Sequence, residues 1–176
     1  GDLGFVVRVA AAEALGRFRG VAAATQVHIG AHGPYKKNPY MTARILQAVG
    51  RVGHESALAF FEEPLKGTDP EAAVQAVRAI GDLPLAVAVD VLLREWDRVE
   101  KKKGSANDDL KRVYDRMQPE VIRILQRILN EKYPTYVEFQ LLWQKRGTAL
   151  KEKAAAEEKA RLAAPPDAAA AKPPLA

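Results

Sequence analysis

Few residues in this 176-residue chain have the type and spacing that metal binding requires. Cysteine is absent, which excludes disulfides, thiolate zinc sites and a cysteine nucleophile. His28 and His32 stand four residues apart, the spacing that places two imidazoles on one face of a helix, but Ile29 stands where a zinc hydrolase has glutamate. His54 is the third and last histidine. We therefore expect the first two to be polar residues at a helix end and not zinc ligands.

The acidic residues give no clearer sign of catalysis. Glu62 and Glu63 are adjacent, so on a helix they point about 100° apart and do not form an acid–base pair. His54-Glu55 is typical of a helix N-terminus, where a glutamate interacts favourably with the helix dipole. The chain has no Ser-His-Asp arrangement, glycine-rich phosphate loop or nucleotide fingerprint. We predict a protein that is not an enzyme, with no catalytic residue, metal or cofactor.

A repeat organises the chain that carries these residues. Three segments end alike, at residues 14–18, 48–52 and 79–83, and their glycines are 34 and then 31 residues apart. Asn38-Pro39 and Asp69-Pro70 each place proline eleven residues before such a glycine. Asn or Asp caps a helix N-terminus, Pro fits the first helical position, and Gly takes the left-handed conformation after the last one. The pattern predicts helices over residues 5–15, 39–49 and 70–80.

A fourth, weaker copy of the repeat begins at Gln118-Pro119 and ends at Asn130, which tolerates the same left-handed conformation as glycine. Apolar helices are expected between the copies, at about residues 21–29, 55–66 and 84–98. Paired helices repeated every thirty-odd residues bury their apolar faces by stacking. The predicted fold class is therefore all-α, an α-solenoid of antiparallel helix pairs.

Two of these segments carry a family resemblance. Residues 5–16 (FVVRVAAAEALG) and 69–81 (DPE followed by AVRAIG) resemble the second helix of a bacterial HEAT-like repeat of the phycobilisome-lyase type. The resemblance covers residues 1–98 and, less closely, 110–130. It implies a HEAT-like or armadillo-like solenoid, a fold that serves scaffolds and enzymes alike. Residues 133–145 are similar to the closing helix that follows such arrays in exported bacterial HEAT proteins, so we expect a closing helix around 135–145.

Composition divides the chain into two parts. We assign residues 1–147 to the solenoid. The helices expected over residues 5–15, 39–49 and 70–80 would each be the second helix of a pair, called second-type helices below. Because the chain begins in such a helix, we expect it to be a fragment whose N-terminal repeats are missing. A charged insertion is expected as a loop over residues 97–110. Residues 148–176 are rich in Ala, Lys and Pro and are predicted to be a frayed helix that passes into a disordered tail. Residues 145–176 hold seven Lys and Arg against four Asp and Glu, so this end carries most of the net charge of +5.

The resemblance also suggests enzymes, which the residues do not favour. HEAT-fold diiron hydroxylases place His-Glu pairs in several repeats, whereas this chain has one, His54-Glu55. Nothing beyond the repeat itself supports a chromophore lyase. HEAT-type DNA glycosylases line a concave face with basic residues, and here the second-type helices carry Arg8, Arg44, Arg78 and Arg123. Interspersed acids and the near-neutral solenoid weigh against a nucleic-acid site. Trp96 and Trp143 are expected in the core or at an end cap.

The function predicted from these observations is a non-catalytic scaffold for protein–protein interaction. A protein or peptide partner would lie along the concave face, with Arg8, Arg44 and Arg78 as polar contacts. Nucleic-acid binding on the same face is the alternative, and a HEAT-fold metal hydroxylase or chromophore lyase comes third. No apolar run approaches the roughly 18 residues of a membrane span. The sequence is compatible with an exported and with a cytoplasmic bacterial protein, and it leaves the oligomeric state open.

Overall fold

The computed structural model describes residues 7, 10, 11, 14, 22–32, 38–133 and 135–163. Within these ranges the chain is entirely helical and has no strand, which confirms the all-α prediction. The elements are α2 (Ala22–His32), α3 (Pro39–Val52), the 3₁₀ helix η2 (Glu55–Ala57), α4 (Leu58–Lys66), α5 (Pro70–Ile80), α6 (Leu85–Lys103), α7 (Asp108–Leu129) and α8 (Tyr136–Ala163). The predicted helix over residues 5–15 falls largely outside the described residues, and Arg8 with it.

The predicted helix starts are confirmed at α3 and α5. The side chain of Asn38 accepts a hydrogen bond from the Met41 amide at 3.1 Å, and Pro39 opens the helix behind it. Asp69 accepts from the backbone amide of Glu71 at 2.9 Å, and Pro70 opens α5. These caps satisfy amides that have no partner inside a helix.

Gly50 and Gly81, the repeated glycines among the described residues, serve a different purpose from the predicted one. Helix α3 continues through Gly50, and the left-handed residue that ends it is Gly53, with φ of 70°. Gly81 is right-handed, with φ of −64°. A Cβ atom on Gly50 would lie 2.6 Å from the Cα of Ala79, and one on Gly81 would collide with the side chain of Ile124. Glycine recurs here because α3, α5 and α7 approach one another too closely for a side chain.

The fourth helix begins earlier than predicted. Asn107 caps it by accepting from the Leu110 amide at 2.9 Å, and α7 runs through Pro119 instead of starting there. The expected charged loop over residues 97–110 is correspondingly short, because its residues lengthen α6 and α7. Proline costs a helix one hydrogen bond and some strain, and buried residues on both sides of it, such as Met117 and Val121, offset that cost. Asn130 has the predicted left-handed conformation, with φ of 53°.

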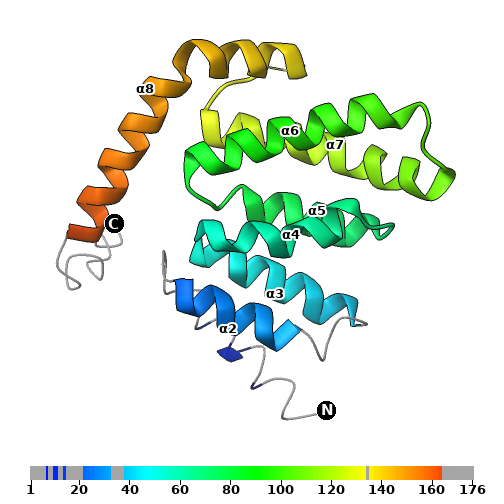
Figure 1. Ribbon diagram of the computed structural model, residues 1–176, viewed down its shortest axis with the longest axis horizontal. Helices are drawn as coiled ribbons and strands as arrows, with labels where there is room; N and C mark the ends of the chain where they lie inside the picture. The colour runs from blue at the N-terminus through cyan, green and yellow to red at the C-terminus, as the bar shows by residue number, and fades with distance from the viewer. Residues whose placement is uncertain are drawn as a thin grey trace, which may run out of the picture.

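The helices pack in sequence order into a stack. Helix α5 lies between α3 and α7 and contacts both, while α4 packs on α5, α6 on α7, and α2 on α3. Helices α4 and α6 lie in front of α5 and α7 in Figure 1. The largest fully buried side chains come from elements throughout the stack and include Ile45, Phe61, Leu92, Met117 and Phe139. This order places α3, α5 and α7 side by side.

Helix α8 is longer than the predicted closing helix. It crosses the end of the stack beside α6 and then turns down along one side, reaching Ala163 (Figure 1). The predicted frayed segment after Gly147 is thus helical as far as residue 163, and residues 164–176 of the predicted disordered tail lie outside the described residues. Thr135 and Glu138 form a capping box at its start, where the Thr135 amide donates to the Glu138 carboxylate at 3.2 Å.

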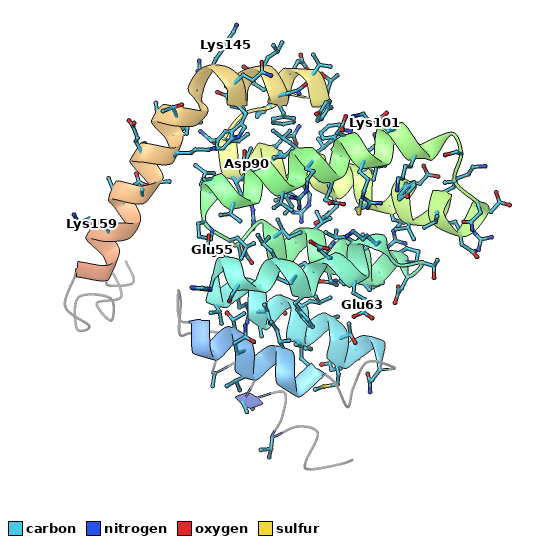
Figure 2. The ribbon with its side chains drawn as sticks, in the orientation of Figure 1. Glu55, Glu63, Asp90, Lys101, Lys145 and Lys159 are labelled. Atoms are coloured by element: carbon cyan, nitrogen blue, oxygen red, sulfur yellow. The ribbon has the colours of Figure 1, made fainter. Side chains whose placement is uncertain are left out.

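Both tryptophans attach α8 to α6. Trp96 is buried on α6, and its ring lies against Tyr136 and Phe139 of α8 at centroid distances of 5.7 and 6.3 Å. Trp143 donates its Nε1–H to Asp90 of α6, which is labelled in Figure 2 at the end of α6 nearest to α8. The expected core and end-cap positions of these residues are confirmed.

Candidate binding groove

A groove of about 450 Å³ runs across α3, α5 and α7. Four of its lining side chains are arginines, and the only carboxylate among the described lining residues is that of Asp82. The lining consists of Tyr40, Ala43, Arg44, Gln47, Gln75, Arg78, Ala79, Asp82, Arg123, Ile124 and Arg127. The groove has this composition because each helix buries its apolar face in the core, and the polar residues beside that face are exposed to solvent.

The structure brings two of the three predicted site residues together. Arg44 on α3 and Arg78 on α5 line the same groove, joined by Arg123 on α7. Arg8 lies outside the described residues. Sequence reasoning missed Arg127, although it follows Arg123 by four residues and therefore lies on the same face of α7.

The centre of the groove is a unit of two arginines that share one carboxylate. Glu120 on α7 accepts from Arg78 Nε of α5 at 2.7 Å through Oε1, and from Arg123 Nε at 3.0 Å through Oε2. Arg123 also donates through Nη2 to Oε1. The side chain of Glu120 is 12% exposed, whereas those of Arg78 and Arg123 are 47% and 57% exposed. The hydrogen bond from Arg123 lowers the pKa of Glu120 most, burial opposes it, and the hydrogen bond and charge of Arg78 add to the lowering, so the pKa lies below its ordinary value.

The next arginine along α7 binds the end of α5. Arg127 donates through Nη2 to the carbonyl of Gly81 and to Asp82 Oδ1, both at 3.1 Å. The Gly81 carbonyl follows the last turn of α5, where carbonyl groups have no partner inside the helix. Arg127 therefore fixes α7 against α5 and is itself partly neutralised.

The α3 wall of the groove carries a stacked pair. Arg44 donates through Nε to the Tyr40 hydroxyl at 3.2 Å, and its guanidinium carbon lies 5.3 Å from the centre of the Tyr40 ring. Tyr40 is exposed, so the pair stands at the groove surface. The pair places the positive charge of Arg44 on the α3 side of the groove.

Taken together, the groove has the chemistry of an anion-binding surface. Among the described residues, four guanidinium groups of the groove are set against two carboxylates, those of Glu120 and Asp82, so positive charge is in excess there. Arginine recognises carboxylate and phosphate groups through paired N–H donors.

The residues that first suggested chemistry have structural partners elsewhere. His54 is the N-cap of η2, and its Nδ1 accepts from the Ser56 amide at 3.1 Å. Glu62 pairs with Lys66 at 2.8 Å, and this hydrogen bond lowers the pKa of Glu62. Across the part of the chain that the structure describes, no three His, Asp or Glu residues gather as a metal site. His28 and His32 fall in the last turns of α2.

A second hollow, of about 400 Å³, lies on α4 and α6. Its lining mixes both signs of charge and consists of Glu62, Lys66, Arg94, Glu95, Asp97, Arg98, Lys101 and Lys102. Most of these groups pair with each other, as Arg98 does with Glu95 at 2.7 Å and Lys101 with Asp97 at 2.6 Å. Its five cations outnumber its three carboxylates, so its formal excess of positive charge equals that of the groove, but four of the five cations pair with carboxylates of the same lining.

Comparison of the chain with protein-family models, with curated proteins and with solved structures found no match. None of the described helices is long and apolar enough to cross a membrane.

Proposed function

We propose that this chain is a non-catalytic HEAT-like solenoid that binds an acidic peptide segment of a partner protein in the α3–α5–α7 groove. One observation carries the proposal: three consecutively packed helices contribute four arginines to one groove, whose described lining has the carboxylate of Asp82 and whose arginines also contact that of Glu120. The solenoid assignment is supported by the packing order, in which α3, α5 and α7 are the second helices of successive pairs. Repeat folds of this kind offer extended surfaces for partners.

The size of the groove suits an extended peptide. Packed helices lie about 8–10 Å apart, so a path from α3 to α7 is about 20 Å long. An extended chain rises about 3.3 Å per residue, which means that about six residues cross the groove. Arg44, Arg78 and Arg123 then stand at successive points along that path.

Peptide is favoured over nucleic acid by the remaining lining residues. Single-stranded nucleic acid is usually held by aromatic rings on which bases stack. Tyr40 is the single aromatic residue among the described lining, and the Arg44 guanidinium lies over its ring.

Fluorescence anisotropy tests the proposal with a labelled peptide of about twelve residues that alternates Asp with Ser and Gly. The Arg44→Gln/Arg78→Gln variant should bind this peptide at least about tenfold more weakly than the unmodified chain, because each charge-assisted hydrogen bond contributes about 1.5–3 kcal/mol. A matched control, Arg94→Gln/Arg112→Gln, removes two positive charges from exposed sites outside the groove. It should change the affinity by less than about threefold.

Two results would overturn the proposal. The first is an acidic peptide that does not bind or that loses affinity equally in both variants. The second is tighter groove-dependent binding of a single-stranded oligonucleotide of the same charge, which would favour the nucleic-acid alternative. A thermal melt of each variant confirms that the fold is retained.

A further inference from the structure

We propose that Arg78, Glu120 and Arg123 form a subsite for a phosphorylated side chain of the bound peptide. The inference rests on the proposed function of the groove and names the chemical group that its centre recognises. Glu120 is the positioning residue, and the two guanidinium groups supply the contacts.

The two arginines are held side by side before any ligand arrives. Arg78 comes from α5 and Arg123 from α7, yet both donate to the same oxygen, Oε1 of Glu120. Glu120 is itself nearly buried, so its carboxylate is a fixed anchor. A guanidinium held in place loses less conformational entropy on binding than a free side chain does.

Each arginine keeps one pair of donors for a ligand. Arg78 uses only Nε toward Glu120, and within the described part of the chain its Nη1 and Nη2 atoms have no partner. Arg123 uses the edge formed by Nε and Nη2, which leaves the edge formed by Nη1 and the second Nη2 hydrogen. Two end-on edges are therefore available at half-exposed side chains that line the groove.

Two edges match a phosphate better than a carboxylate. A carboxylate has two oxygens in one plane and a single negative charge. A phosphate monoester has three terminal oxygens and a charge of about −1.5 to −2 near neutral pH, so it can accept from both edges at once. The unit has one positive charge after Glu120 is counted, and the neighbouring Arg44 adds another.

The test uses three peptides of the acidic sequence described above that differ only at the centre, which is Ser, Asp or phosphoserine. The unmodified chain should bind the phosphoserine peptide at least about tenfold more tightly than the Ser peptide and about fivefold more tightly than the Asp peptide. Arg78→Lys/Arg123→Lys keeps the charges but removes the paired donors. This variant should lose the phosphoserine advantage, while its binding of the Ser peptide changes less than about threefold.

Glu120→Gln separates positioning from simple electrostatics. The substitution removes a negative charge from the groove, so charge alone would tighten binding of the phosphoserine peptide. If Glu120 positions the two arginines, binding weakens by about threefold or more even though the positive charge rises. Tighter binding by this variant would overturn the positioning role.

The inference and the proposed function fail in different ways. Binding of all three peptides with equal affinity would overturn the phosphate subsite and leave the acidic-peptide groove in place. Binding of none of them would overturn both. Competition by inorganic phosphate or by a phosphodiester oligonucleotide, set against the phosphoserine peptide, shows whether the subsite prefers a monoester, and preference for the oligonucleotide would contradict the proposal.

Discussion

Two Glu-x-x-Arg pairs with the same spacing stand on neighbouring helices, Glu95–Arg98 on α6 and Glu120–Arg123 on α7. In the first pair the side chains are 7% and 18% exposed, so both partners are withdrawn from solvent. In the second pair the carboxylate is nearly as buried, but the arginine stands in the groove. The same local sequence therefore forms a buried ion pair on α6 and an ion pair with an exposed arginine on α7.

The difference lies in the remaining donors of each arginine. Arg98 donates through Nε to Glu95 and through Nη2 to the Leu65 carbonyl at 3.0 Å, near the end of α4. Its Nη1 reaches the Tyr114 hydroxyl on α7 at 3.5 Å, and its guanidinium lies over the Tyr114 ring. All three nitrogens of Arg98 are engaged and join three helices. Arg123 donates to Glu120 through the edge formed by Nε and Nη2, and its Nη1 has no hydrogen-bond partner among the described residues.

The strongest test of this contrast is to remove each arginine in turn. Arg98→Met leaves the buried Glu95 carboxylate, among the described residues, with only the 3.7 Å ion pair to the exposed Arg94, and should lower the free energy of unfolding by about 3 kcal/mol. Arg123→Met removes an exposed partner while Arg78 still bonds to Glu120, and should cost less than about 1 kcal/mol. Urea denaturation followed by circular dichroism measures both values.

A double substitution serves as the control for the buried pair. Glu95→Leu/Arg98→Met removes both charges together, so no unpaired carboxylate stays in the interior. Its loss of stability should be smaller than that of Arg98→Met alone. Equal losses for Arg98→Met and Arg123→Met would show that burial does not distinguish the two pairs.

Close backbone approach is the second feature that separates the groove from the α4 and α6 surface. Gly50→Ala places a Cβ atom 2.6 Å from the backbone of Ala79, so α3 and α5 must move apart. We expect a loss of about 1–3 kcal/mol in unfolding free energy, the usual cost of overpacking. Gly104→Ala is the matched control, because it follows α6 with right-handed geometry and has nothing within 4 Å of a new Cβ. The control should be neutral or stabilise by up to about 1 kcal/mol, and a comparable loss there would argue against the packing explanation.

Local signals predicted the helices well because caps and apolar spacing act over a few residues. Asn38, Asp69 and Asn130 have the conformations and roles expected from residue type. The reason for the repeated glycines was missed, since close contact between α3 and α5 depends on residues about thirty positions apart. Pro119 led to the wrong start for the fourth helix, because buried residues on both sides of it keep α7 continuous through the proline.

Part of the candidate site could also be predicted. Arg44 stands five residues after Pro39 and Arg78 eight residues after Pro70, so the two differ by one helical turn on the same helix face, and the periodicity placed them on one surface. The sharing of Glu120 by Arg78 and Arg123 joins residues 42 positions apart, and nothing in the local sequence specifies which of the many acids will meet which arginine. The distinction between Arg98 and Arg123 likewise depends on which helix covers each pair.

The smallest expected effect is the pH dependence that the Glu120 carboxylate gives to stability. Because hydrogen bonds from Arg123 and Arg78 lower its pKa in the folded chain, Glu120 stabilises the fold above the pKa of the unfolded chain, and this stabilisation is lost as the pH falls through the folded value. The stability difference between the unmodified chain and Glu120→Gln should therefore be largest near neutral pH and should shrink below about pH 4. Urea midpoints measured across this range test the sign. Glu62→Gln, at the exposed pair with Lys66, should have a smaller effect at every pH because solvent screens that pair. A difference for Glu120→Gln that grows on acidification would show that the groove arginines do not depend on this carboxylate, and would remove the main physical distinction between the two Glu-x-x-Arg pairs.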